Sequence, residues 1–383
     1  MKIKRNIHLM YAIGLLQGMV FYAPIASLYR QARGLTLGQI ALIESISFIF
    51  TLAMELPWGV IADRVGYKMT MIAGCALYFL SKLIFWRANG FGTFLLERFV
   101  ISAAIAGLSG VDESILYLSC DEAESQKVFG RWSAFGTAGM LLAAWFFAAF
   151  IRDDYALAAL CTVASYGLAA LLALGLKEVR QPEKTRRAPG RAFLRLLLDT
   201  LRDGRFLLLL LAVALYGETL QAVTVWLNQN QYILCGMTDR GIGWAYVAVT
   251  VASMASVFSK YVTDKLGRLR SAVVIFCLTG FGCAVLAFTR SAALSVGCIM
   301  AMAAGSGLIG PLFSQVYNQH ITTADRATQL SIFAVLGDTA AAGATLAYGQ
   351  TANVSLSGAF LLGTGVCVAG ALILLWGRTY FDA

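Results

Sequence analysis

The sequence is dominated by apolar runs of about 20 residues, the length that a helix needs to cross the hydrocarbon core of a bilayer. Twelve such runs can be drawn, at roughly 7–29, 37–61, 69–87, 92–117, 131–151, 156–176, 206–228, 239–262, 271–289, 293–317, 328–350 and 356–377. Hydrophobic residues make up 59% of the 383 residues and charged residues only 13%, which is too little charge to cover a soluble surface. Lipid admits only helices or closed barrels, and runs of this length favour helices. We therefore predict an all-α integral membrane protein with 12 transmembrane helices.

The positions of the charged residues predict the orientation of these spans. Of the 30 Lys and Arg residues, 22 fall in or beside loops on one side of the predicted membrane, and six fall near loops on the other. Cytoplasmic loops carry such an excess, so we expect both termini in the cytoplasm and a multi-pass protein of the cell (inner) membrane. The first span follows MKIKRNIHLM without a small-residue cleavage site, so we expect it to be retained.

Several other classes of function are not expected. A net charge of +9 can indicate nucleic-acid binding, but no basic and aromatic stripe lies outside the predicted spans, so we expect no nucleic acid partner. The eight cysteines form no Cys-x-x-Cys pair and lie mostly in apolar runs, where they behave as small hydrophobic residues. We predict no metal site and no cofactor. The sequence carries neither a phosphate-cradling Gly-Lys-Ser/Thr motif nor nucleophile–base spacing, so neither ATP as the energy source nor an enzyme is expected.

One long polar break divides the spans into six and six. The first part of residues 177–205 contains two Pro and is mostly polar, whereas four leucines between positions 194 and 201 share one helical face. Such a pattern suits a helix lying on the anionic inner leaflet, although an ordinary solvated linker would also fit. We therefore predict an N-terminal six-helix bundle at 1–176, a cytoplasmic linker with an amphipathic helix at 177–205, and a C-terminal six-helix bundle at 206–383.

The two halves repeat each other at a fixed offset. Three residues of the first half recur 201 positions later, since Asp63, Gly66 and Gly136 correspond to Asp264, Gly267 and Gly337. The strings GVIADRVG and KYVTDKLG each follow the second span of their half. A repeated helical half is typical of secondary transporters, in which the halves rock about a site near the bilayer midplane.

The repeated strings carry a resemblance to a known family. Residues 55–68, ELPWGVIADRVGYK, resemble the loop 2–3 signature of the major facilitator superfamily, and residues 260–270, KYVTDKLGRLR, resemble its loop 8–9 counterpart. The resemblance extends over the whole chain in span number, central loop and charge bias. It implies the major facilitator fold, two pseudo-symmetric six-helix bundles. The gating motif that it implies comprises Gly59, Asp63, Arg64, Gly66, Lys68, Asp264, Gly267 and Arg268.

The resemblance also implies how this motif works. Asp63 would face the N-terminus of the eleventh helix, and Asp264 would face the fifth helix in the same way. A helix N-terminus carries partial positive charge, so a carboxylate there is stabilised and would latch the inner gate. The alternative is that these charges only anchor the topology.

A second signature gives a mixed indication of transport direction. Arg98 opens the fourth span, as in drug–proton antiporters of the superfamily, which the chain resembles here. However, Ser102 stands where a Gly is expected, and the segment Gly136–Ala144 of the fifth span lacks the Pro of the antiporter motif. The missing Pro favours import by a symporter, which therefore stays as an alternative to efflux.

Ionisable residues inside the spans are the candidates for proton coupling, because each costs ~2.5–3.5 kcal/mol to insert. Glu218 lies about 18 Å and Asp338 about 15 Å from the inner face, near the midplane of a ~30 Å core. Burial favours the neutral form of a carboxyl group, so either could exchange a proton or attract a cation. A structural hydrogen bond is the alternative. Asp112 and Glu113, nearer the inner end of span four, could relay protons or simply be wetted by the inner vestibule.

Two further groups of residues complete the predicted site. Glu44, Lys82 and Arg98 lie at similar depth in the outer third of the first half, which predicts buried ion pairs with a mainly structural role. The resemblance places spans one, four, seven and ten around the substrate cavity. The predicted cavity residues are Gln17, Phe21, Tyr22, Arg98, Gln221 and Trp226. Trp226 could stack on a flat or cationic substrate, or it could belong to an interfacial aromatic belt.

These features together predict a secondary active transporter that works by alternating access. We expect proton-coupled efflux of small amphipathic or cationic compounds, with Glu218 exchanging a proton for substrate. The expected partners are the small-molecule substrate, protons and the lipid bilayer, and a monomer is expected. One alternative is a proton-coupled symporter that imports a small metabolite. The alternative from another class is a non-transporting membrane receptor or scaffold.

Overall fold

The computed structural model describes residues 3–121, 124–151, 154–179, 201, 203–320 and 326–381, apart from some side chains within helices. These residues are helical almost throughout, and no strand occurs among them. Within this part of the chain, 11 helices are long and apolar enough to cross a membrane, and a bent pair, Asp239–Ser256 with Ser259–Leu266, makes a twelfth if it is one span. The predicted all-α fold is confirmed.

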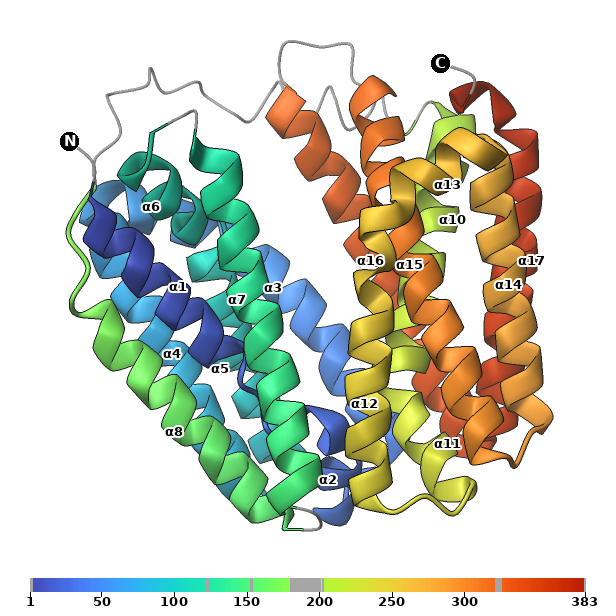
Figure 1. Ribbon diagram of the computed structural model, residues 1–383, viewed down its shortest axis with the longest axis horizontal. Coiled ribbons are helices and arrows are strands. Elements are labelled where there is room, and N and C mark those ends of the chain that lie inside the picture. The colour runs from blue at the N-terminus through green and yellow to red at the C-terminus, as the bar shows by residue number, and fades with distance from the viewer. Residues whose placement is uncertain are drawn as a thin grey trace. The chain divides into compact units, whose positions relative to one another are not determined.

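The helices form two compact units (Figure 1). Unit 1 contains Met1–Leu35, Ile46–Thr185 and Asp239–Trp244, and unit 2 contains the remaining three segments, Thr36–Ser45, Arg186–Thr238 and Ala245–Ala383. The division at 1–176, 177–205 and 206–383 stays a prediction. Most of the predicted linker, including most of the predicted amphipathic helix, lies outside the described residues.

Unit 1 is built from the first six spans. Its elements are α1 (Lys4–Gly18), the 3₁₀ helix η1 (Ala23–Ile25), α2 (Ala26–Ala32), α3 (Leu37–Val65, whose start belongs to unit 2), α4 (Tyr67–Arg87), α5 (Phe91–Leu108), α6 (Val111–Ser119), α7 (Ser125–Phe146), the π-helix η3 (Phe147–Ile151) and α8 (Tyr155–Ala173). Within the unit, α1 packs against α7 and α8, while α4 packs against α5 and α8. Two predicted spans are interrupted, the first after α1 and the fourth between α5 and α6.

Unit 2 is built from the last six spans. Its elements are α10 (Gly204–Gln221), the π-helix η4 (Ala222–Leu227), α11 (Asn228–Leu234), α12 (Asp239–Ser253, whose start belongs to unit 1), the 3₁₀ helix η5 (Met254–Phe258), α13 (Ser259–Leu266), α14 (Arg268–Phe288), α15 (Ala292–His320), α16 (Arg326–Val354), α17 (Leu356–Trp376) and the 3₁₀ helix η6 (Arg378–Tyr380). Here α14 packs against α17 and α15, and α10 packs against α16 and α17.

The helix bounds follow the 201-residue repeat of the sequence. Helices α4 and α14 begin and end 201 residues apart, and α8 and α17 begin 201 residues apart. The residue before α4 and the residue before α14 are both glycines with positive φ, +96° at Gly66 and +84° at Gly267. Only glycine adopts such a conformation at no steric cost. Each half therefore requires a glycine at this equivalent turn.

The glycines of the fifth span have a packing role in unit 1. A Cβ atom on Gly18 of α1 would collide with the backbone carbonyl of Gly136 on α7, and one on Gly139 would collide with the carbonyl of Leu15. Small residues three or four apart let membrane helices approach backbone to backbone. The segment Gly136–Ala144, which has no Pro, therefore holds α7 tightly against the end of α1.

Candidate functional site

Glu218 lies one turn before the end of α10 and is 4% exposed. The Thr345 hydroxyl of α16 donates a hydrogen bond to Glu218 Oε1 at 2.6 Å. Within the described part of unit 2, no Lys or Arg lies within ion-pair distance of this carboxyl group. Glu218 is therefore a buried acid held by a neutral hydroxyl, an arrangement in which both its neutral and charged forms can be satisfied.

The hydrogen bonds on either side of Glu218 hold it in place. The adjacent Thr219 hydroxyl bonds with the Tyr348 hydroxyl at 2.7 Å, and one turn earlier the Tyr216 hydroxyl bonds with the Thr279 hydroxyl at 3.2 Å. These contacts tie α10 to α16 and α14. The carboxyl group is thus positioned by helix-borne side chains rather than by a loop.

The seventh span departs from α-helical geometry directly after Glu218. Residues Ala222–Leu227 form a π-helix, which widens the turn and frequently occurs at functional sites. The Asn228 amide donates to the Thr224 carbonyl at 2.7 Å, and the Gln229 amide donates to the Val225 carbonyl at 2.9 Å. The polar residues at the predicted outer end of the seventh span therefore satisfy carbonyl groups near its π-turn, a use that the sequence alone did not indicate.

The other predicted residues of unit 2 differ in exposure. Trp226 lies within the π-helix and is buried, whereas Gln221 is exposed. Asp338 is also exposed. Because it lies two turns before Thr345 on α16, it shares the helix face that contacts Glu218. Their roles in coupling and in substrate binding stay predictions.

In unit 1, three of the predicted cavity residues lie at or just after the end of α1, whereas Arg98 belongs to α5. The Gln17 amide donates to the Cys75 sulfur at 3.4 Å. Phe21 and Tyr22 follow where the helix stops, and both are buried. The Tyr22 ring stacks on Phe85 with ring centres 4.0 Å apart. In this structure the aromatic pair therefore contributes to the interior of unit 1.

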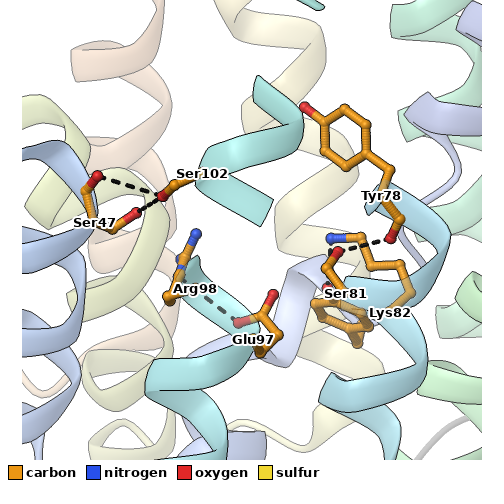
Figure 2. Close-up of polar contacts among 8 residues, drawn as sticks. Ser47, Tyr78, Ser81, Lys82, Glu97, Arg98 and Ser102 are labelled. Atoms are coloured by element: carbon orange, nitrogen blue, oxygen red, sulfur yellow. Dashed lines mark hydrogen bonds and ion pairs between the residues drawn. The ribbon is translucent and has the colours of Figure 1, made fainter. Parts of the chain in front are cut away.

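Helices α4 and α5 of unit 1 carry buried charges (Figure 2). Lys82 of α4 is 4% exposed, and its Nζ donates to the Tyr22 hydroxyl at 3.1 Å. Glu97 of α5 is 1% exposed, and its Oε2 lies 4.0 Å from Arg98 Nε. Glu44 belongs to the short stretch of α3 that is part of unit 2. Sequence reasoning missed Glu97 as a partner for Arg98, although an acidic residue inside an apolar run is itself a signal.

The fourth span is interrupted beside its acidic pair. Helix α5 ends at Leu108, Gly110 has a φ of +75°, and α6 starts at Val111. Asp112 and Glu113 therefore lie in the first turn of a new helix, where the partial positive charge of the helix end stabilises carboxylates. The Asp112 carboxylate also accepts the backbone N–H of Glu113 at 2.8 Å. This local stabilisation is one structural reason for the pair, and its role in relaying protons stays a prediction.

The first copy of the gating motif is capped from the start of the predicted linker. The Glu178 carboxylate accepts the backbone N–H of Lys68, at 3.3 and 3.4 Å to its two oxygens, at the N-terminus of α4. It lies directly against Gly66, where a Cβ atom would meet its oxygen at 2.8 Å. Arg64 is exposed. Gly59 and Asp63 belong to α3, but the surroundings of Gly59 and the side chain of Asp63 lie outside what the structure describes.

The second copy of the motif borders a cavity of about 580 Å³ within unit 2. Its lining includes Lys260, Asp264, Gly267 and Arg268. The opposite side is formed by α15 around Pro311. Asp264 is exposed there, so the carboxylate at the position equivalent to Asp63 is accessible rather than packed into its own unit. Among the described residues, no cluster of His, Cys, Asp and Glu could hold a metal ion.

Comparisons with known proteins agree with this architecture. Solved structures similar to the chain include a mutant of the nucleoside transporter NupG, with 14% identity, 97% of this chain and 99% of that chain covered, and a TM-score of 0.82. A D-xylose-proton symporter has 14% identity, coverage of 100% and 98%, and a TM-score of 0.74. A bacterial homolog of the human lysosomal transporter Spinster, in an inward-facing and unoccupied conformation, has 14% identity, coverage of 100% and 97%, and a TM-score of 0.74.

At these identities the structures show a shared fold. No curated protein sequence matches the chain significantly. The family model of the Major Facilitator Superfamily, in contrast, matches residues 7–345, nearly the whole chain. With two helical units, a 201-residue repeat and 11 or 12 apolar spans, the chain is a multi-pass membrane protein that belongs to the Major Facilitator Superfamily and has the fold of a secondary transporter rather than an enzyme.

Proposed function

We propose that the chain is a proton-coupled transporter in which Glu218 takes up and releases the coupling proton. The observation that carries the proposal is the burial of Glu218 beside the Thr345 hydroxyl, with no cation within ion-pair distance in the described part of unit 2. A buried carboxyl group without a compensating charge is costly when ionised. Such a group persists in a membrane span chiefly where it has a function.

The Thr345 hydroxyl supplies a simple way to accommodate both protonation states. It has one hydrogen and two acceptors within reach, Glu218 Oε1 at 2.6 Å and the Ala341 carbonyl at 2.9 Å. When Glu218 is ionised, Thr345 donates to the carboxylate. When Glu218 is protonated, its own O–H can donate to the Thr345 oxygen, and Thr345 can turn to the Ala341 carbonyl. Neither state leaves the carboxyl group without a partner.

We propose efflux of small amphipathic or cationic compounds as the direction of transport, with both termini in the cytoplasm of a cell (inner) membrane and a monomer as the working unit. A buried acid attracts positively charged substrate when its site is empty, which supports a cationic class. The exposed Asp338 on the same face of α16 adds to the negative potential. The latch roles of Asp63 and Asp264 belong to the same proposal.

Import by symport is the second candidate, because one similar structure is that of a D-xylose-proton symporter. The fifth span also supports it, since the segment Gly136–Ala144 lacks the Pro of the antiporter motif. Both candidates use Glu218 in the same way. They differ in whether substrate and proton move in opposite directions or together.

The test uses the full-length protein in proteoliposomes with an imposed pH gradient. Ethidium is the cationic probe, and radiolabelled D-xylose and uridine are the uptake probes. We expect ethidium to move against the proton flux and to stop when nigericin collapses the gradient. Glu218→Gln should abolish gradient-driven flux, while Asp154→Asn, which keeps the N-cap of α8, should not. Co-directional xylose or uridine flux would support the symporter, and flux unaffected by nigericin would exclude proton coupling.

A further inference from the structure

The first span is not a continuous helix. Helix α1 ends at Gly18, and the chain becomes helical again only with η1 at Ala23 and α2 at Ala26. The Lys4–Ala32 segment is nevertheless apolar and long enough to be one crossing. Irregular backbone inside a membrane span leaves polar groups that must find partners elsewhere in the protein.

Side chains of α8 supply the partners that the break removes. In an unbroken helix the Phe21 N–H would bind the Gln17 carbonyl. Instead, the Phe21 N–H donates to the Thr162 hydroxyl at 3.0 Å, and the Tyr166 hydroxyl donates to the Gln17 carbonyl at 2.7 Å. Both halves of one lost hydrogen bond are therefore replaced, one helical turn apart on α8. The Ser165 hydroxyl also donates to the Met19 carbonyl, at 3.0 Å.

The Lys82 ammonium group lies against the same break. Its Nζ donates to the Tyr22 hydroxyl at 3.1 Å and lies 5.0 Å from the centre of the Tyr166 ring and 5.7 Å from that of Tyr22. The cation is thus enclosed by two phenol groups, one within the break and one hydrogen-bonded to the end of α1. Among the described residues of unit 1, no carboxylate lies within ion-pair distance of it.

The other half of the molecule does without this arrangement. The positions 201 residues after Tyr22, Lys82 and Tyr166 are Val223, Cys283 and Cys367. All three are buried, yet none carries a charge or a hydroxyl group. The seventh span stays helical through the equivalent stretch, with only a π-turn. The fold itself therefore does not require a cation at this place, and Lys82 needs another reason to remain buried.

We propose that Lys82 is the resident cation of the broken first span, with its ammonium group filling a site for a small primary ammonium ion formed by the Tyr22 and Tyr166 phenol groups. Breaks in transporter helices commonly expose carbonyl groups and a negative helix end that bind a cation. Here the chain itself supplies that cation. Lys82 is then a positioning residue that keeps the break, and the two phenol groups at it, in the arrangement used for transport.

The proposal predicts chemical rescue in purified full-length protein. Lys82→Ala removes the atoms of one n-propylammonium ion and leaves the site open. We expect its Tm to be lower than that of the wild type, and n-propylammonium chloride to raise it in a saturable manner, by about 2 °C at ten times the Kd. Equal concentrations of sodium chloride or of neutral 1-propanol should give no such rise.

Two variants distinguish specific binding of an ammonium ion from non-specific filling of a cavity. Lys82→Met keeps the side-chain volume but not the charge, so its Tm should not respond to n-propylammonium. Cys283→Ala opens a space at the equivalent buried position of the other half, and it too should show no selective response. Equal responses in wild type, Lys82→Met and Lys82→Ala, or no response beyond that to sodium chloride, would overturn the proposal.

A third comparison holds even if Lys82→Ala does not fold. Buried ionic groups with only a structural role can often be replaced by hydrophobic residues of similar volume with no loss of stability, or with a gain. We instead expect Lys82→Arg to retain a higher Tm and more gradient-driven flux than Lys82→Met. A Lys82→Met protein at least as stable and as active as Lys82→Arg contradicts a resident cation.

Discussion

The first and seventh spans occupy equivalent positions in the two halves, but they depart from α-helical geometry in different ways. Both depart from α-helical geometry within about four residues of equivalent polar residues, Gln17 and Glu218. The first span breaks, and α8 replaces its lost hydrogen bond through Thr162 and Tyr166. The seventh span continues as a π-helix. The difference follows from the supporting helix, because the positions equivalent to Thr162 and Tyr166 are Gly363 and Cys367, which cannot supply the same hydrogen bonds.

This comparison teaches that a structural repeat can keep its bounds while dividing its chemistry. The first half buries a cation, Lys82, at the irregular point of its leading span. The second half buries an acid, Glu218, just before the irregular point of its own. Helices α4 and α14 nevertheless keep identical lengths and offsets. The two halves share their backbone framework, whereas each of these two charged groups occurs in one half and has no equivalent in the other.

The largest expected effect tests the assignment of the acid. Glu218→Gln should reduce proton-driven flux at least ~10-fold, because an interaction needed for the coupled step is worth ~1.4 kcal/mol or more, while the purified protein keeps its Tm. The matched variant is Gln17→Leu at the equivalent position, which removes the amide bonded to Cys75. Because Gln17 is itself a predicted cavity residue, the quantity compared is the ratio of flux with and without the pH gradient, and not total flux. If Gln17→Leu lowers this ratio as much as Glu218→Gln does, the two halves are not divided in the way we propose.

The next effect concerns the tight packing at the end of α1. Gly18→Ala should destabilise the protein by about 1–3 kcal/mol, because its Cβ would meet the Gly136 backbone, which cannot move aside easily. Gly217→Ala on α10 has no atom within 4 Å of the new Cβ and should be neutral or slightly stabilising. Thermal unfolding of the two variants in the same detergent measures the difference. Equal Tm values would show that a Cβ atom at Gly18 fits beside Gly136, which contradicts the close contact in the structure.

A third prediction addresses the replaced hydrogen bond. Thr162→Val leaves the buried Phe21 N–H without its acceptor, at a cost of about 1–2 kcal/mol. Thr137→Val serves as the control, since Thr137 bonds to a carbonyl of its own helix turn. Hydrogen exchange followed by mass spectrometry should show faster exchange of peptides covering residues 19–22 in Thr162→Val alone. Unchanged exchange there would mean that α8 does not hold the break.

The smallest expected effect lies outside the spans, where the chain enters unit 2. Asp203 caps α10 by accepting the Phe206 N–H at 3.1 Å, and the Tyr380 hydroxyl donates to Asp203 at 3.3 Å. Partial burial and the neighbouring Asp203 charge raise the pKa of Tyr380 above its usual value of 10.0. A raised pKa in the folded state contributes stability that is present below pH ~10 and lost as the pH rises through the folded value.

Tyr380→Phe should therefore lower the Tm slightly at neutral pH and make the alkaline decline above pH ~10 shallower. Tyr261→Phe, at an exposed tyrosine, is the control for the general effect of losing a phenol group. If the Tm of Tyr380→Phe falls above pH ~10 as steeply as that of the wild type, the contribution of the Tyr380–Asp203 contact is contradicted. In unit 1, Glu178 caps α4 through the Lys68 N–H, so the Tm of Glu178→Gln at neutral pH extends the comparison of the two halves to their helix ends.

Much of the fold could be predicted because it depends on local patterns. Apolar run length determined the spans, and the 201-residue repeat paired Gly66 with Gly267, which both precede a helix with positive φ in the structure. The midplane position of Glu218 in the sequence also indicated a buried acid, and the structure buries it. These features follow from hydrophobicity, glycine geometry and the cost of burying charge, each of which can be evaluated from neighbouring residues alone.

Other features depended on partners that are distant in the sequence. The break at residues 19–22 exists because Thr162 and Tyr166, more than 140 positions away, complete its hydrogen bonds. The phenol groups around Lys82 and the hydroxyl beside Glu218 come from other helices in the same way. Composition and periodicity determined that this chain crosses the membrane as two repeated helical halves. Only the tertiary structure decided where those helices break and which buried groups contact the charges, because a hydrogen bond between helices depends on their packing and not on the local sequence.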